Sequence, residues 1–468
     1  MIVARLWLVT HRPIWHDEAF TEWAGRLGPA ALVAALREDS GPPLFYVLER
    51  PLARSVSSAR DEWLPRLLPF TATLLLLAAA RSLPPGSARR WWIVLCSSFA
   101  LVNLYAAEAR AYALLGLASL VIFLLGVVRP ERPGALWGLF FAAGAALWLH
   151  YLALLSVASA FLVALADRRF RSALVLVAAL AAFFPWLSIL RAQPPEAMAW
   201  LRESPAATGI GIVSALGGVG RIPAPFGPAL PILRTLAAAL GAVLVLLLAR
   251  TAREDPGIRA ALLFVLLVLG MALALSVWRP IAFAGRCEMA VLPVWMWAVA
   301  RAAPGRRALS AAAGFAAAAG VAATIVVAAS RHPRPTATAA VERVAQLARP
   351  GDVLLGGPAL YLPALLASSR GQLAARVAAL PSGDAAHPGW FVATEPGPSE
   401  EAALRATMEG IRPGQRLWVL LPPSHDTPGI MRTLSASGSV RELVRQADAV
   451  LLVWTPAPAD RSKADRAS

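Results

Sequence analysis

Two adjacent carboxylates near the N-terminus, Asp17 and Glu18, are the first residues of this chain that could do chemistry. A carboxylate can take a proton from a hydroxyl group when burial or a like-charged neighbour raises its pKa toward the working pH. The second carboxylate could then orient the hydroxyl group or share a divalent cation. The pair could equally open a helix over 18–27, because negative charge is stabilising at a helix N-terminus. The spacing alone leaves both interpretations open.

Asp39 is the next acidic candidate, and it lies directly before a Ser-Gly-Pro-Pro sequence. An aspartate before such a sequence is typical of a turn. The Pro-Pro pair predicts a rigid stop that orients an amphipathic segment over 44–54, which contains Tyr46. This pattern by itself favours a turn-forming Asp39; Asp39 and Tyr46 are also kept as candidates for a loop that meets an acceptor.

A third set of reactive side chains lies in the sequence Glu-Ala-Arg-Ala-Tyr at 108–112. Glu108 and Tyr112 are four residues apart and share one face of a helix. Arg110 lies between them, where it could meet a phosphate. Arginine and tyrosine are also common at membrane interfaces. A glutamate next to apolar segments is less expected there and favours a functional interpretation.

His150 and Arg286 complete the candidate set. A single histidine is more often structural than a ligand, but together with one of the acids it could bind a metal or a phosphate. Arg286 lies at the start of a late apolar segment. An arginine in that position can hold a phosphate through bidentate, charge-assisted hydrogen bonds, or it can be an interfacial anchor.

The composition predicts which elements carry these residues. Of the 468 residues, 58% are hydrophobic and 15% are charged, which is typical of a polytopic membrane protein. The net charge of +16 comes from arginines between apolar runs, so membrane topology explains it better than nucleic-acid binding. Residues 1–9 are too short to span and are the end of a first span or an interfacial segment. Ten full spans are predicted at about 67–82, 91–107, 110–128, 135–149, 151–166, 172–190, 229–249, 259–277, 283–300 and 308–329.

The arginines between the predicted spans are distributed unevenly. Five short loops hold fourteen of them: Arg81, Arg89, Arg90, Arg129, Arg132, Arg168, Arg169, Arg171, Arg250, Arg253, Arg259, Arg301, Arg306 and Arg307. The alternate loops hold six: Arg110, Arg191, Arg202, Arg221, Arg279 and Arg286. The positive-inside rule places the first set in the cytoplasm. The 10–66 loop, the 191–228 loop, the turns at 108, 150 and 286 and everything after 330 then face outward, together with all the candidate residues.

The chain divides by composition into a membrane domain over 1–330 and a soluble region after it. The long outer loop, 10–66, carries short amphipathic helices. Region 331–457 is predicted to be a small outward-facing α/β domain, and 458–468 a disordered tail. The expected strands of the α/β domain are 352–356, 390–394, 416–421 and 449–454, and its expected helices are 337–348, 399–411 and 429–446.

Six short motifs follow one another along residues 1–300. They are Trp15-His16-Asp17-Glu18-Ala19, Asp39-Ser40-Gly41-Pro42-Pro43-Leu44-Phe45-Tyr46, Glu108-Ala109-Arg110-Ala111-Tyr112, His150-Tyr151, Pro185-Trp186 and Arg286-Cys287. In kind and order they resemble the motifs of bacterial membrane glycosyltransferases of the GT-C superfamily, in the family 39-like group. That group is similar to protein O-mannosyltransferases and to aminoarabinose transferases acting on lipid A. Each motif is weak alone, and the six in order are more specific.

The resemblance implies a GT-C fold that moves a sugar from a polyprenyl-phosphate donor to a hydroxyl group of a protein, lipid or polysaccharide. Transfer would occur on the outer face of the cytoplasmic membrane, with inversion at the anomeric carbon. By the same resemblance Asp17 is the general base, and Glu18, Asp39 or Glu108 assists the acceptor or a metal. Some relatives use a divalent cation and others do not; here its candidate ligands are Glu18, Asp39 and His150.

The resemblance also implies that Arg110, Arg286 and His150 face the donor phosphate, with Tyr112 beside them. One position departs from the pattern, because Cys287 stands where relatives carry tyrosine after the arginine. This departure weakens the assignment of Arg286.

Two other functions remain open at this point. A transporter or flippase of lipid-linked sugars is expected to carry charges or broken helices near the bilayer midplane. The candidates here lie at turns on one face instead, which favours an enzyme. In the third interpretation the chain is a non-catalytic scaffold, in which 331–457 binds partners in the cell envelope.

Overall fold

The computed structural model divides the chain into two compact units, each built from segments that are not contiguous in sequence. The first unit comprises Met1–Arg12, Ser40–Glu49 and Trp63–Arg331; the second comprises Pro13–Asp39, Arg50–Glu62 and His332–Ser468. The sequence predicted one domain boundary, at residue 330, and did not predict that two N-terminal segments group with the C-terminal region. The structure describes residues 1–194, 204–222, 229–278, 280–330, 335–357, 360–380, 400–422, 427–446 and 449–457.

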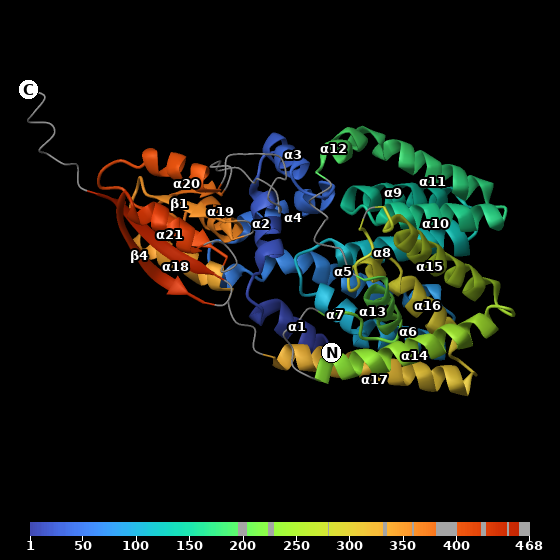
Figure 1. The fold of residues 1–468 in the computed structure, drawn as a ribbon. Coiled ribbons are helices and arrows are strands. Elements are labelled where there is room, and N and C mark those ends of the chain that lie inside the picture. The colour runs from blue at the N-terminus through green and yellow to red at the C-terminus, as the bar shows by residue number, and fades with distance from the viewer. Residues whose placement is uncertain are drawn as a thin grey trace, which may run out of the picture. The chain divides into compact units, whose positions relative to one another are not determined.

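The first unit is a bundle of helices (Figure 1). Its helices are α1 (Ile2–His11), α5 (Leu67–Ala78), α6 (Ser87–Ser98), α7 (Ala100–Tyr105), α8 (Tyr112–Phe123), α9 (Pro133–Leu149), α10 (Ala153–Ala166), α11 (Phe170–Phe183), α12 (Leu187–Ala192), α13 (Pro205–Leu216), α14 (Ala229–Thr251), α15 (Pro256–Leu275), α16 (Leu292–Ala302) and α17 (Arg307–Ala329), and α4 (Leu44–Ser55) belongs in part to each unit. Within the described residues, five helical segments are long and apolar enough to cross a membrane: Leu64–Ser82, Phe170–Ala192, Leu230–Thr251, Pro256–Leu275 and Arg307–Ala329. The other apolar helices are shorter.

Two features of this bundle differ from the predicted spans. The span expected at 91–107 is two helices, α6 and α7, separated at Phe99, whose backbone is extended. In addition, α13 lies in the region expected to be an outward loop. The broken pair and α13 meet, because the Ala100 N–H donates to the Gly218 carbonyl at 2.8 Å. The sequence around Phe99 gave no sign of this break, because the hydrogen-bond partner that accompanies it lies far along the chain.

Glycines let α13 end inside the bundle. A side chain on Gly217 would collide with the Ala237 carbonyl, about halfway along α14. Gly218 has a φ of +100°, and a side chain there would collide with the Ala316 carbonyl, about halfway along α17. Both glycines are therefore required by close backbone approach, and Gly218 also by its left-handed conformation. As a result α13 is a half-length helix that stops midway along its neighbours.

A buried arginine ties the N-terminal helix into the bundle. Arg5 of α1 is fully buried; its Nε donates to Asn103 Oδ1 at 2.5 Å, and its guanidinium also donates to the Cys96 carbonyl. The Asn103 amide in turn donates to Thr324 Oγ1 of α17 at 2.9 Å. A charge inside an apolar bundle requires such partners. Residues 2–11 therefore form a helix packed within the unit, held by more than interfacial position.

The second unit contains the predicted α/β structure, a five-stranded sheet in the order β2-β1-β3-β5-β4. Strands β2, β1 and β3 are parallel, whereas β5 runs antiparallel to both β3 and β4. The strands are β1 (Val353–Gly356), β2 (Arg376–Ala379), β3 (Leu417–Leu421), β4 (Gly438–Arg445) and β5 (Val450–Pro456). The helices are α2 (His16–Arg26), α3 (Pro29–Arg37), α18 (Thr336–Leu347), α19 (Tyr361–Ser369), α20 (Glu400–Glu409) and α21 (Thr427–Ser435).

Most of the elements predicted after residue 330 are present, and one is wrong. The helix expected over 429–446 ends at Ser435 as α21, and β4 follows it. The strand is favoured by its pairing with β5. It begins at Gly438, where β5 approaches so closely that a side chain would meet Trp454. Strand β2 was not predicted. The strand expected at 390–394 and the tail at 458–468 lie outside the described residues.

Asp352, directly before β1, connects that strand to the start of its neighbour β3. Its carboxylate accepts hydrogen bonds from the Arg349 N–H, the Arg416 N–H and Nε, and the Trp418 indole, at 2.9 to 3.1 Å. Burial alone would raise the pKa of Asp352, but these hydrogen bonds outweigh it and hold the pKa below its ordinary value. The stabilisation is therefore present at neutral pH and is lost as the pH falls through that lowered pKa.

Candidate active site

Three aromatic rings, those of Tyr105, Tyr112 and His150, form a contiguous aromatic cluster in the first unit. The ring centroids of Tyr105 and Tyr112 are 4.7 Å apart, and those of Tyr112 and His150 are 5.0 Å apart. The Tyr105 hydroxyl donates to the Gly285 carbonyl at 2.5 Å, which ties the aromatic cluster to the loop before α16. The Glu-Ala-Arg-x-Tyr turn, the His-Tyr turn and the Arg-Cys turn therefore meet, as their predicted position on one face requires.

Two guanidinium groups approach the central ring of this aromatic cluster. The Cζ atom of Arg110 lies 6.0 Å from the ring centroid of Tyr112, and that of Arg286 lies 5.8 Å from it. Aromatic faces attract cations, so one ring helps to hold two like charges near each other. Glu108 and Glu288 lie within electrostatic reach of Tyr105 beside them. The arrangement is suited to an anion that can accept from both arginines.

The loop that carries Arg286 is shaped by two residues beside it. Gly285 has a φ of +94°, and a side chain there would meet the Arg221 carbonyl. The carboxylate of Glu288, which is fully buried, accepts the Gly285 N–H at 2.8 and 2.9 Å. Cys287 is also buried, with its Sγ 3.5 Å from Glu288. Glu288 was not among the predicted site residues; only its place beside Arg286 could have indicated it.

His150 is held as a neutral hydrogen-bond donor. Its Nδ1 accepts the Leu152 N–H at 3.1 Å, so the proton of the neutral ring is on Nε2. Burial, followed by the charges of Arg110 and Arg286, lowers its pKa to about 3. The ring therefore adds an N–H donor to the two arginines and no third positive charge.

We expect acid to destabilise the protein through His150. Its folded pKa lies below its ordinary value of 6.5, so the unfolded chain binds the additional proton and stability falls as the pH drops below about 6.5. Part of the residue remains accessible, so the loss between pH 7 and pH 5 should be at most about 2 kcal/mol. Thermal unfolding of wild type and His150→Gln at the two pH values measures it. An equal loss in both proteins would contradict the assignment.

A hydrogen-bond chain joins three further motif segments in the first unit. The Trp186 indole donates to the Tyr151 hydroxyl at 2.9 Å, and that hydroxyl donates to Gln193 Oε1 at 2.9 Å. The Gln193 amide then donates to the Gly41 carbonyl at 3.3 Å. The Pro-Trp motif, the His-Tyr motif and the Gly-Pro-Pro loop are thereby connected. Tyr46 is buried nearby in sequence, and its ring adjoins Gly41.

The N-terminal carboxylates belong to the second unit. Asp17 and Glu18 lie in the first turn of α2 and are 7% and 1% exposed, respectively. Asp17 Oδ1 is 3.4 Å from His16 Nε2. Both acids therefore open a helix, and they are also buried, which a solvated helix start does not require. Their roles remain predictions.

Asp39 lies just beyond α3 and is 5% exposed. It lies close enough to Tyr361 of α19 to act on it: burial, and then the negative charge of Asp39, raise the pKa of that tyrosine. The structure thus brings Asp39 next to the C-terminal α/β region, a neighbour that the sequence did not indicate.

The candidate metal ligands do not form a site of three donors. In the part of the chain that the structure describes, no three histidine, cysteine, aspartate or glutamate side chains gather to hold a metal ion. Glu18 and Asp39 are in the second unit and His150 is in the first, where its Nδ1 already accepts a backbone hydrogen bond. A divalent cation stays a prediction, and the steps below do not depend on one.

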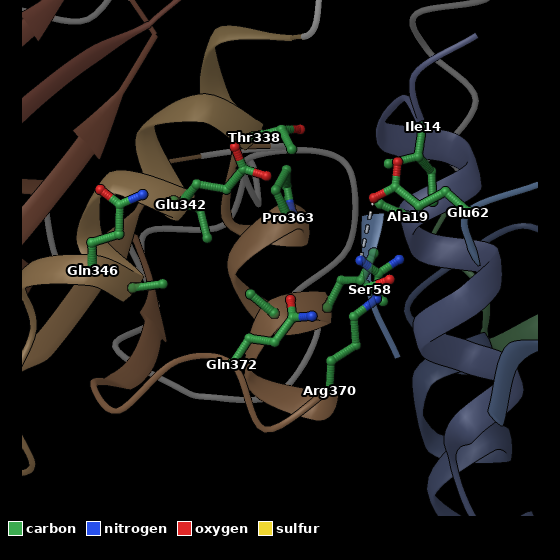
Figure 2. A pocket seen from close by; sticks show the side chains of 14 residues that line it. Ile14, Ala19, Ser58, Glu62, Thr338, Glu342, Gln346, Pro363, Arg370 and Gln372 are labelled. Carbon is green, nitrogen blue, oxygen red and sulfur yellow. Dashed lines mark hydrogen bonds and ion pairs between the residues drawn. The ribbon is translucent and has the colours of Figure 1, made fainter. Parts of the chain in front are cut away.

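Sequence reasoning missed a buried ionic cluster in the second unit. Arg370, at the end of α19, binds the carboxylates of Glu22 on α2 and of Glu62. Figure 2 shows Arg370 and Glu62 on the wall of a pocket of about 340 Å³, which is also lined by Ala19 and by Glu342 of α18. Glu22 follows Glu18 by one helical turn, but its partner is 348 residues away in the chain. No local pattern could have indicated this pairing.

Comparison with known proteins finds similarity in structure only. No protein-family model matches the sequence, and no curated protein matches it. The structure is similar to the crystal structure of ArnT from Cupriavidus metallidurans in the apo state, with a TM-score of 0.63 and 13% identity over 97% of this chain and 96% of that one. It is also similar to ArnT from the same organism bound to undecaprenyl phosphate, with a TM-score of 0.61 and 14% identity over the same shares. The helical bundle and the C-terminal α/β region therefore have the same fold as ArnT.

Proposed function

We propose that this protein is an integral-membrane glycosyltransferase that moves a hexosyl or pentosyl group from polyprenyl phosphate to a hydroxyl acceptor. The observation that carries the proposal is the gathering of Arg110, Arg286 and His150 around Tyr112. That cluster lies in a fold shared with a protein whose structure was solved with undecaprenyl phosphate bound. The acceptor hydroxyl group belongs to a protein, a lipid or a polysaccharide.

In the proposed reaction, the donor phosphate accepts hydrogen bonds from Arg110, Arg286 and His150 Nε2–H. Asp17 removes the proton from the acceptor hydroxyl, and the acceptor oxygen attacks the anomeric carbon of the sugar with inversion. The bond from that carbon to the phosphate oxygen breaks, and its electron pair stays on the phosphate. The arginines stabilise the charge that develops there, while Glu18 or Glu108 orients the acceptor.

The proposed location is the cytoplasmic membrane, with the reaction on its outer face. Fourteen arginines lie in the loops at the opposite end of the predicted spans from Arg110 and Arg286, which supports this orientation. Two of those loops are paired in the structure: Arg301 binds Asp255 at 2.9 Å, and Arg306 binds Glu254 at 3.1 Å.

The test is transfer by the purified protein in liposomes from a panel of polyprenyl-phosphate hexoses and pentoses, with hydroxyl acceptors of all three classes. We expect one donor to be consumed with release of polyprenyl phosphate. Consumption of no donor would contradict the proposal. Parallel reactions with EDTA, and with EDTA followed by excess Mg²⁺ or Mn²⁺, test whether a divalent cation takes part.

One observation favours transport of lipid-linked sugars as the second candidate function. Helix α13 stops midway along α14 and α17 and meets the break between α6 and α7. Half-helices and broken helices are features of transporter binding sites. The same liposomes separate the two functions: movement of intact donor between leaflets, without release of polyprenyl phosphate, would support transport.

A further inference from the structure

The chemistry proposed for Asp17 and Glu18 depends on how α2 is held. Nine of its eleven residues are buried, from Asp17 to Gly25. Within the second unit α2 packs against α19. The strongest polar contact between these two helices is a buried cluster of charges that no motif in the sequence includes.

Arg370 is the centre of that cluster. Its Nε and Nη2 donate to the two oxygens of Glu22 at 2.9 and 2.5 Å, and its Nη1 donates to Glu62 at 3.2 Å. Its side chain is 5% exposed and that of Glu22 is 0% exposed. Burial alone would lower the pKa of Arg370, but hydrogen bonds and charge from Glu22, then Glu62, raise it above its ordinary value. The guanidinium is therefore fully charged and bound in a fixed fork geometry.

The backbone around Arg370 is equally specified. Helix α19 ends at Ser369, and Gly371 has a φ of +70°, which lets the chain turn away directly after Arg370. The next side chain, Gln372, donates to the Ser57 carbonyl at 2.8 Å. These contacts fix the point from which the Arg370 side chain leaves its helix.

Such a cluster specifies position more than it adds stability. Removing charges from water is costly, and the attraction of a buried pair often only offsets that cost. Glu22 also accepts a hydrogen bond from Arg26 at 3.0 Å, but Arg26 belongs to α2 itself and cannot fix α2 against α19. Breaking the pair with Arg370 removes one of the two charges that compensate this buried carboxylate, so the helices are held in the one arrangement that keeps the fork closed. Glu18 lies one turn before Glu22 on the same face of α2, so the bond at Glu22 also sets the rotation of Glu18.

We propose that Arg370 is a positioning residue for the carboxylates of α2. By holding Glu22, the C-terminal α/β region sets the axial position and rotation of α2, and thereby of Asp17 and Glu18. This inference rests on the proposed function for its effect on activity. It gives the α/β region a role in the reaction itself, beyond binding partners in the cell envelope.

The test compares Arg370→Ala with Arg416→Ala in the full-length protein in liposomes. Arg416 binds the buried Asp352 and the Leu347 carbonyl in the same unit, so it is the matched control for loss of an ion pair to a buried carboxylate outside α2. We expect Arg370→Ala to lower kcat about 100-fold, as a displacement of about 1 Å can, with the donor KM within about twofold of wild type. Arg416→Ala should keep kcat near wild type.

Rescue gives a readout that a general loss of stability would not. The pocket beside Arg370 has room for a small cation, so millimolar methylguanidinium should restore part of the kcat of Arg370→Ala. Arg370→Lys should keep more activity than the alanine variant, because it retains the charge without the fork. Unchanged kcat in Arg370→Ala, or an equal fall in Arg416→Ala, would overturn the proposal.

Hydrogen exchange tests the same inference without the reaction. Amides of α2 should exchange at least about 10-fold faster in Arg370→Ala than in wild type or Arg416→Ala, because α2 loses its fixed docking. Unchanged protection of α2 would overturn the positioning role whatever the activity shows. If wild type transfers no sugar while the exchange difference is present, the proposed function fails and the positioning of α2 by Arg370 stands.

Discussion

Replacing Asp17 by asparagine is expected to lower the rate of sugar transfer about 1,000-fold, within the range that a general base contributes. The amide has the size and shape of the carboxylate but cannot accept the proton of the acceptor hydroxyl. Asp17 is almost fully buried in the first turn of α2, so the substitution is small and removes one charge. The measurement is kcat with the donor selected from the panel, together with the donor Kd, which should not change.

Two companion variants determine what that loss means. Asp167→Asn changes an exposed aspartate after α10 and should leave transfer at the wild-type rate. Glu18→Gln should lower kcat about 10-fold, as expected for an orienting neighbour that does not take the proton. Near-normal kcat in Asp17→Asn together with a large loss in Glu18→Gln would move the base to Glu18. Near-normal kcat in both would exclude this pair as the source of the base.

Replacing Arg110 or Arg286 by alanine is expected to weaken donor binding by about 10- to 150-fold for each. Each guanidinium supplies charge-assisted hydrogen bonds worth about 1.5–3 kcal/mol to a phosphate. Both arginines lie beside the Tyr112 ring, so their contributions should couple, and the double variant should deviate from the product of the single effects. The measurement is the Kd of undecaprenyl phosphate for the purified variants.

Two controls separate the effect of the charge from the effect of the position of the arginine. Arg286→Lys retains the charge but not the bidentate fork, so it should bind more tightly than Arg286→Ala and more weakly than wild type. Arg253→Ala removes an exposed arginine from a loop of the predicted cytoplasmic face and should leave the Kd unchanged. Wild-type Kd in both Arg110→Ala and Arg286→Ala would show that these residues are interfacial anchors.

The amino-acid sequence by itself determined the class of the protein and the grouping of several candidates. Long apolar runs predict membrane helices from composition alone, and the uneven arginines predict which turns lie at one end. Tyr112, His150 and Arg286 meet in the structure, and the sequence had placed them at the same end because an even number of predicted spans separates the turns that carry them. Local periodicity also predicted α18, β1, β3 and β5, whose patterns extend over consecutive residues.

Other features required partners that are distant in the chain. The break at Phe99 is capped by Gly218, and β4 is a strand because β5 pairs with it, where the local pattern had predicted a helix. Segments 13–39 and 50–62 group with the C-terminal region although most helices of the bundle lie between them and that region in the chain. Each of these outcomes depends on a hydrogen bond or a packing contact that no short window of sequence contains.

Helix α2 shows, within one element, what the sequence indicated and what the tertiary structure decided. The sequence offered a helix start at Asp17 and Glu18 as one of two open interpretations, because negative charge is stabilising at a helix N-terminus. Only the tertiary structure decided that this helix is buried and that Glu22 on it binds Arg370, 348 residues away. A buried charge needs an opposite charge in three dimensions and not at a fixed spacing in the chain, so that pairing was decided by the fold.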